Sequence, residues 1–274
     1  MIPRFCVAFA AVTLAFGSLI AAAGSADAAT TPHPGITHVR PGGAVHTFVP
    51  GGVMQRPTGA LARGRAASNQ AESTNWSGYA ATGSAGSFSS VSSSWTEPSA
   101  TCNDSGDEYA AFWVGLDGYN SSSVEQTGTD SDCSGGSPDY YGWYEMYPNA
   151  PVYYNNPVQP GDSMSASVSV SGDTYTLVLT DSTQNWTQTQ TISESGLQDS
   201  SAEVITEAPS SGSGVLPLAD FGTINYSGSA ANGSSMANSS PTSIIMVGSS
   251  GDQLDSTGPM DGSGDFSNTW MAES

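Results

Sequence analysis

Hydrophobic and polar residues alternate over short stretches in the second half of the chain. Within residues 163–170, Met164, Ala166, Val168 and Val170 alternate with serines. A period of two is typical of a strand with one buried face. Residues 171–173 supply a Ser-Gly-Asp turn, and residues 175–179 are apolar enough to form the returning strand. The pattern therefore predicts a β-hairpin.

The rest of the chain shows the same preference for strands. Residues 186–192 form a Thr/Gln-rich stretch that is polar on both faces, and residues 243–247 form a short apolar run. The Ser/Gly-rich stretches 227–240 and 248–264 are expected to be loops or weak strands. No helical periodicity extends beyond about ten residues. These features predict an all-β sandwich of roughly 200 residues.

The beginning of the chain has the features of a secretory signal. Arg4 precedes an apolar stretch at residues 5–23, and Ala26–Asp27–Ala28 supplies small residues for cleavage. We therefore expect residues 1–28 to be a signal peptide and the mature protein to be secreted and extracellular. No later segment is apolar over a length that would span a bilayer, so no membrane association is expected.

Residues 29–71 differ in composition from the sequence that follows. This stretch is rich in proline, contains four arginines and all three histidines, and has no acidic residue. It is predicted to be a basic pro-segment, followed by a catalytic domain at residues 72–274. Our hypothesis is that it inhibits this acidic domain at neutral pH and dissociates when carboxylates become protonated. A linker without function is the alternative.

Charge is distributed very unevenly along the chain. Of the 25 Asp and Glu residues only Asp27 precedes Ala66, and no Lys, Arg or His follows Arg65. Nothing in the later region could neutralise phosphates, so nucleic acid is an improbable partner. Neighbouring carboxylates raise each other's pKa, which predicts a domain that is most stable in acid. An acidic surface that only confers solubility does not explain the loss of every basic residue.

The cysteines indicate one disulfide bond. Cys6 lies in the expected signal peptide, which leaves Cys102 and Cys133 as a pair in an oxidising compartment. The bond would close a loop of about 30 residues and contribute roughly 3–4 kcal/mol to stability. With two cysteines and no histidine, a zinc site is not expected. Calcium could bind the acidic loops at residues 104–108 or 130–132, but no calcium-loop spacing supports such a site, so no metal is predicted.

The missing residue types exclude several mechanisms. Without His or Lys after Arg65, the domain cannot form a Ser-His-Asp triad, a Cys-His or Ser-Lys dyad, or a Schiff base. The available general bases are carboxylates. Negative charge on a substrate must be stabilised by backbone N–H groups, amides, hydroxyls or neutral carboxylic acids. Two enzyme classes remain: peptide hydrolysis by carboxylate-activated water, and glycoside hydrolysis by two carboxylates.

Five short segments occur in an informative order. They are NWSGY at 75–79, FWVGLDG at 112–118, VEQTG at 124–128, WYEMYP at 143–148 and AEVITEAP at 202–209. Together, from about residue 75 to residue 219, they resemble the glutamic peptidases called eqolisins. The resemblance implies a lectin-like sandwich of two antiparallel seven-stranded sheets. It also implies a secreted endopeptidase that cleaves proteins in acid without a cofactor.

The resemblance assigns the catalytic pair to Gln126 and Glu207. As a general base, Glu207 would take a proton from the attacking water and return it to the leaving amine, which is worth roughly 10²–10⁴-fold in rate. The amide of Gln126 would donate to the oxyanion, which is worth on the order of 10²–10³-fold. Glu203 competes with Glu207, because alternate residues of a strand share a face.

The resemblance also suggests four substrate-binding residues: Trp76, Trp113, Asp117 and Glu145. The tryptophans could instead be core residues, and the two acids could be hydrogen-bonded turn residues. The chain departs from the family pattern at Glu125, Met146 and Val204, where apolar or aromatic residues are usual.

Two other functions remain open from the sequence. One is a glycosidase using Glu145 and Glu207, and the other is a non-catalytic lectin-like module whose Trp and Tyr side chains stack on sugars. We expect a monomer that acts on peptide substrates.

Overall fold

The computed structural model describes residues 36–39, 45–48, 70–103, 106–211 and 214–274. The predicted signal peptide and most of the predicted pro-segment lie outside these residues. Between residues 29 and 69 the described part consists of two short strands, β1 (Ile36–Val39) and β2 (Val45–Phe48), which pair with each other. No helix in the described part of the chain is long and apolar enough to cross a membrane.

Strands make up almost all of the regular structure. They are β3 (Gln70–Ser73), β4 (Trp76–Thr82), β5 (Ser90–Thr96), β6 (Ala111–Leu116), β7 (Val124–Ser134), β8 (Ser137–Tyr147), β9 (Val152–Tyr153), β10 (Ser163–Ser171), β11 (Thr174–Asp181), β12 (Trp186–Ser193), β13 (Ser201–Glu207), β14 (Ser210–Ser211), β15 (Gly214–Val215), β16 (Thr223–Ala231), β17 (Ser234–Ser235), β18 (Thr242–Val247), β19 (Gln253–Thr257) and β20 (Phe266–Trp270). Among the described residues, the only helical element is the 3-10 turn Met236–Ser239.

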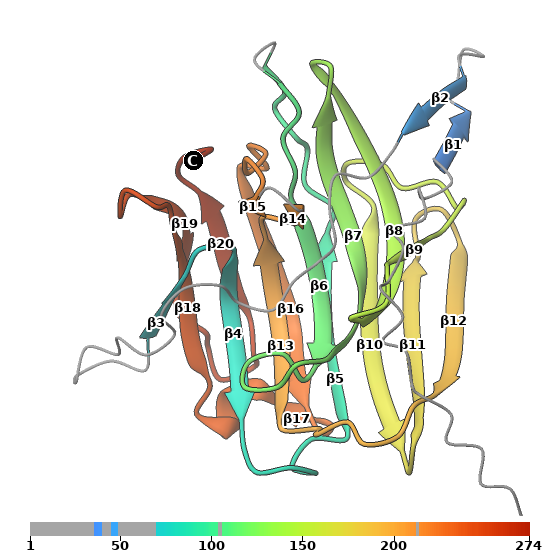
Figure 1. Ribbon diagram of the computed structural model, residues 1–274, viewed down its shortest axis with the longest axis vertical. Helices are drawn as coiled ribbons and strands as arrows, with labels where there is room; N and C mark the ends of the chain where they lie inside the picture. The colour runs from blue at the N-terminus through green and yellow to red at the C-terminus, as the bar shows by residue number, and fades with distance from the viewer. Residues whose placement is uncertain (1–35, 40–44, 49–69, 104–105, 212–213) are drawn as a thin grey trace, which may run out of the picture. The chain divides into compact units, whose positions relative to one another are not determined.

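The strands form a path that folds over itself into two layers (Figure 1). The hydrogen-bonded order is β12-β11-β10-β5-β16-β20-β19-β18-β4-β13-β6-β7-β8-β9. Neighbours along this path are antiparallel, while the short β3 adds to β18 in parallel. Strands β5, β10 and β11 of one layer contact β6, β7 and β13 of the other. The prediction of an all-β, antiparallel sandwich is therefore confirmed.

The core between the layers explains the alternating sequence pattern. Met164, Ala166 and Val168 on β10 are buried, and so are Leu177 and Leu179 on β11. They pack in one cluster with apolar residues of β6 and β13. The two strands form the predicted hairpin, with Ser171 opposite Thr174. β12 lies at the edge of the sheet, which is why its polar pattern on both faces is tolerated.

The central strands β6 and β13 are buried on both faces. One face of each belongs to the core between the layers, and the other belongs to a second apolar cluster. This second cluster contains Trp76, Trp113, Tyr141, Trp143 and Ile205, with several smaller residues around them. We refer to this side of the sheet as the tryptophan face. Because side chains on both faces of these strands contact apolar residues, neither strand shows an alternation of apolar and polar residues in its sequence.

The two Ser/Gly-rich stretches predicted as loops or weak strands both contain strand residues. β16 covers part of the Ser/Gly-rich stretch 227–240, and β19 lies within 248–264. On β16, Ile224 and Tyr226 are buried, while many of the intervening residues are exposed. The alternation of buried and exposed positions is that of a strand, although few of the residues are apolar. Pairing with β5 and β20 stabilises the strand despite its low local strand propensity.

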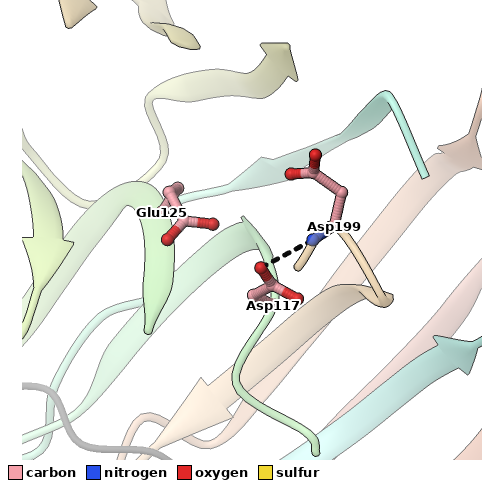
Figure 2. Close-up of side chains that lie close together, drawn as sticks. All are labelled: Asp117, Glu125 and Asp199. Carbon is pink, nitrogen blue, oxygen red and sulfur yellow. Dashed lines mark hydrogen bonds between the residues drawn. The ribbon is translucent and has the colours of Figure 1, made fainter. Parts of the chain in front are cut away.

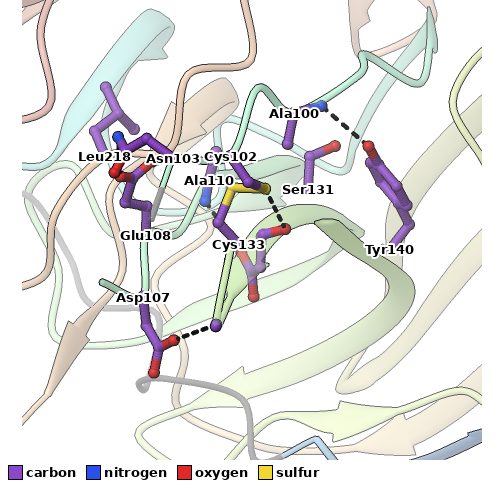
Figure 3. The surroundings of a disulfide bond; sticks show 12 residues. Ala100, Cys102, Asn103, Asp107, Glu108, Ala110, Ser131, Cys133, Tyr140 and Leu218 are labelled. Carbon is purple, nitrogen blue, oxygen red and sulfur yellow. Dashed lines mark hydrogen bonds between the residues drawn. A yellow bond between two sulfur atoms is a disulfide. The ribbon is translucent and has the colours of Figure 1, made fainter. Parts of the chain in front are cut away.

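The predicted disulfide bond between Cys102 and Cys133 is present (Figure 3). Cys133 belongs to β7, the strand that also carries Gln126. The bond is supported by two backbone hydrogen bonds between Glu108 and Cys133. The disulfide therefore ties the loop after β5, which carries Cys102, to the far end of β7.

Candidate active site

The five motif segments lie on five strands that are neighbours in space. The order β4, β13, β6, β7, β8 brings together segments from residues 75 to 209. In register, Glu207 pairs with Ala111, Trp113 pairs with Gly128, and Gln126 pairs with Glu145. Paired residues point to the same side of a sheet, and so do residues two apart along a strand. Glu207, Trp113, Gln126 and Glu145 therefore all lie on the tryptophan face.

Glu207 is buried at the end of β13 and is held by neutral donors. Asn75 donates its side-chain N–H to Oε1 at 3.1 Å, and the indole N–H of Trp113 donates to Oε2 at 2.9 Å. Trp76 packs edge-on against Trp113, with ring centroids 4.9 Å apart, and so fixes the indole. An indole N–H can only donate, so this contact orients one carboxylate oxygen as an acceptor.

Gln126 and Glu145 form a second buried pair. The amide Nε2 of Gln126 donates to Oε2 of Glu145 at 2.5 Å. Burial raises the pKa of Glu145 well above its usual range; the hydrogen bond from Gln126 opposes this shift, and the charge of Glu207 adds to it. Gln126 Oε1 and Glu145 Oε1 make no hydrogen bond within the described residues. The pair thus contains unused polar atoms inside an apolar face.

Aromatic donors also serve other carboxyl groups on this face. The indole N–H of Trp143 donates to Asp130 at 2.6 Å, and the hydroxyl of Tyr141 donates to Asp132. Burial raises the pKa of Asp132 to about 8 and that of Asp130 well above its usual range. In a domain without Lys, Arg or His, indole and phenol groups provide the hydrogen bonds that cations commonly provide elsewhere.

Some of these partners could not be assigned from the sequence. Asn75 begins the first motif, but nothing in the pattern shows that it reaches Glu207, 132 positions away. The pairing of Gln126 with Glu145 is another contact between separate segments. The only sequence signal for this contact is that both residues belong to segments that carry the resemblance to the eqolisins.

The four residues suggested for substrate binding have different surroundings. Trp76, Trp113 and Glu145 lie on the tryptophan face beside the pair Gln126 and Glu207, and all are buried. Asp117 lies beyond the other end of β6, where its carboxylate accepts hydrogen bonds from the backbone of Gln198, Asp199 and Ser200. It shapes a loop there and lies apart from Glu207.

Gly128, the glycine of the QTG motif, allows β6 and β7 to approach each other. A Cβ atom at this position would lie 2.1 Å from the carbonyl oxygen of Phe112 and 2.6 Å from the Cβ of Trp113. We expect Gly128→Ala to cost about 1–3 kcal/mol and to displace Trp113, the donor to Glu207. Hydrolysis should then slow about 10–100-fold, as misplaced catalytic groups do.

Thermal melts and acid proteolysis rates of the variant measure this effect. Gly262→Ala is the matched control, because no atom lies within 4 Å of a Cβ built at that position. Equal melting temperatures and rates for the two variants would show that Gly128 has no such role.

Comparison with known proteins identifies related molecules. Residues 74–268 match the model described as the peptidase A4 family. Aspergillopepsin-2 of Aspergillus niger is 26% identical to this chain, in a match that covers 89% of this chain and 94% of the relative.

Two solved structures show the same fold. Scytalido-glutamic peptidase, crystallised with a peptide-based transition state analog, superposes with a TM-score of 0.62 at 24% identity, covering 72% of this chain and 98% of that one. Aspergilloglutamic peptidase from Aspergillus niger has a TM-score of 0.52 at 27% identity, covering 60% of this chain and 99% of the other. From its motifs, its sandwich and these matches, the chain belongs to the peptidase A4 family, the glutamic peptidases or eqolisins, and is a peptide-bond hydrolase.

Proposed function

We propose that the chain is a secreted endopeptidase that works in acid, with Glu207 as general base and Gln126 as oxyanion donor. The observation that carries this proposal is the shared tryptophan face, on which a carboxylate oriented by Trp113 lies on the same side as the Gln126–Glu145 pair. Membership in a peptidase family favours peptide bonds over the two alternatives, a glycosidase and a sugar-binding module.

The first step is attack by water. The water oxygen bonds to the scissile carbonyl carbon while Glu207 accepts one proton from that water. The carbonyl oxygen becomes an oxyanion. The indole N–H of Trp113 donates to one oxygen of Glu207 and so orients the carboxylate. In the second step Glu207 returns the proton to the leaving nitrogen, and the carbon–nitrogen bond breaks.

The amide of Gln126 suits the oxyanion. Its NH₂ group has two hydrogens, and the hydrogen bond to Glu145 uses one of them. The second can donate to the developing negative charge. Burial raises the pKa of Glu145 well above its usual range, so in acid this group is neutral and adds no charge that would oppose the oxyanion. Glu145 is thereby a positioning residue for Gln126.

Peptides and proteins are the substrates under this proposal, which is supported by the related scytalido-glutamic peptidase, whose crystal structure contains a peptide-based transition state analog. The basic segment 29–71 is proposed as an inhibitor of the acidic domain, on the basis of its opposite charge. Its arginines would lose their acidic partners as the carboxylates become protonated, so release in acid accompanies activation.

Replacement of Gln126 tests the proposed oxyanion donor. We expect Gln126→Ala to lower kcat about 10²–10³-fold with a much smaller change in KM, because the lost hydrogen bond forms in the transition state. Denatured casein digested by the mature domain at about pH 3 provides the assay, with cleavage products sized by mass spectrometry.

Gln159→Ala is the matched control, since Gln159 is exposed. Retention of full kcat by Gln126→Ala would contradict the assignment. Digestion that stops when a chelator is added at this pH would point to metal-dependent chemistry in place of the carboxylate mechanism.

A further inference from the structure

A second group of acidic residues lies away from Glu207. β6 runs from Ala111, opposite Glu207, to Leu116, and Asp117 follows it. At a rise of about 3.3 Å per residue, Asp117 lies about 20 Å along the strand from Glu207. Glu125, at the start of β7, pairs with Leu116, and Asp199 lies in the loop before β13. Three neighbouring strands thus bring three separate segments to one end of the sheet.

The three carboxyl groups converge. One oxygen from each of Asp117, Glu125 and Asp199 can be chosen so that all three lie within 4.8 Å of one another. Figure 2 shows the carboxyl groups facing a common space. No Lys, Arg or His occurs after Arg65, so no side chain of the domain can neutralise this concentration of negative charge.

Glu125 is the least satisfied member of the group. Its side chain is buried, with 0% of its surface exposed, and neither carboxylate oxygen makes a hydrogen bond of normal geometry. The hydroxyl of Ser123 lies close to the carboxyl group, outside that geometry. A buried carboxylate without a partner costs several kcal/mol, so such a group requires a compensating ligand or a proton. Its carboxyl group points into the space between Asp117 and Asp199.

The two other residues are held in place by the surrounding structure. Asp117 accepts backbone N–H groups from residues 198–200, together with the hydroxyl of Ser200. Asp199 accepts the hydroxyl of Tyr175 at 2.7 Å through Oδ1, which leaves Oδ2 for a ligand. Asp199 is also partly exposed, which gives an ion a route from solvent. Asp117 already accepts four hydrogen bonds, so it is the weakest ligand of the three and contributes mainly its charge.

We propose that Asp117, Glu125 and Asp199 form a calcium-binding site. Carboxylate oxygens are the ligands that hard cations prefer. Calcium bonds to oxygen at about 2.3–2.6 Å in flexible geometry, so three carboxylate oxygens within 4.8 Å of one another can share one ion. Water molecules on the Asp199 side complete the coordination. The site ties the 198–200 loop to β7 and compensates the charge of Glu125.

This site is a property of the tertiary structure. Its ligands come from three segments, so no calcium-loop spacing marks them in the sequence.

Calcium titration at pH 7 tests the proposal. We expect 10 mM CaCl₂ to raise the melting temperature of the mature domain by roughly 5–10 °C over a sample in EDTA, which corresponds to a Kd of about 0.1 mM. NaCl at matched ionic strength controls for screening. Terbium should show luminescence sensitised by Tyr175 and displaced by calcium.

The variant Glu125→Gln separates site binding from general charge effects. It should melt close to the wild type in EDTA and should lose the calcium response. Glu194→Gln, which neutralises an exposed carboxylate near the same loop, should keep that response. The proposal is overturned if calcium and matched NaCl give equal melting temperatures for the wild type. It is also overturned if Glu125→Gln responds to calcium as the wild type does.

Discussion

Glu207→Gln is expected to lower the rate of peptide hydrolysis in acid by at least about 10³-fold, at the upper end of general acid–base effects. The substitution keeps the size of the side chain but removes the group that accepts the proton of water. Asn75 and Trp113 both donate to Glu207, so a glutamine presents its NH₂ group to at least one donor. We therefore also expect a loss of about 1–3 kcal/mol in stability, from the unpaired donor.

The assay compares kcat of the mature domain and the variant on denatured casein, after thermal melts have shown that both are folded. Glu203→Gln is the matched control, because Glu203 lies on the same strand and the same face as Glu207 and is also buried. Loss of activity in Glu203→Gln with retention in Glu207→Gln would transfer the role of base to Glu203.

A further variant separates catalysis from folding. Trp113→Phe removes the N–H that orients Glu207 while the carboxylate remains. We expect a smaller loss of kcat than in Glu207→Gln, together with a changed pH–rate profile. If kcat and the profile were both unchanged, the indole would have only a packing role.

The second large effect concerns stability and pH. Burial raises the pKa of Glu97 to about 7, against the opposing hydrogen bonds from Thr129, Ser131 and Trp95. Burial also raises the pKa of Asp132 to about 8, and those of Asp130, Glu145 and Asp255 well above their usual ranges. In the unfolded chain these groups have ordinary values near 4. The folded state therefore holds protons that the unfolded state releases.

The direction of the pH effect follows from this difference. Because the folded pKa values are raised, the stability from these groups is fully present below about pH 4 and declines as the pH rises through the folded values. Ionisation of Glu97 alone lowers the free energy of unfolding by on the order of 3 kcal/mol as the pH rises from about 4.5 to about 7. We expect the melting temperature of the mature domain to be highest in acid and to fall steeply towards pH 8.

Scanning calorimetry from about pH 3 to pH 8 measures this dependence. Glu97→Gln should flatten the part of the curve between about pH 4.5 and pH 7, whereas Glu72→Gln, at an exposed position, should follow the wild type. A maximum of stability at neutral pH in metal-free buffer would contradict the expected protonation of the buried carboxyl groups.

The sequence alone was sufficient for conclusions that depend on local pattern or on composition. The period of two on β10 and β11 predicted their hairpin, because one buried face requires alternation. The absence of basic residues after Arg65 excluded nucleophilic triads and ion pairs without any knowledge of the fold. The two remaining cysteines predicted the disulfide, and the ordered motifs predicted the family.

Tertiary structure decided which of the acidic residues act together. Glu207 and Asn75 are 132 positions apart, and only the order of β4, β13, β6, β7 and β8 brings their segments to one face with Gln126. The same order removes Asp117 from that group and brings it to Glu125 and Asp199. Strand pairing between distant segments has no local signal, and burial, which determines the pKa of each carboxyl group, exists only once both layers have packed.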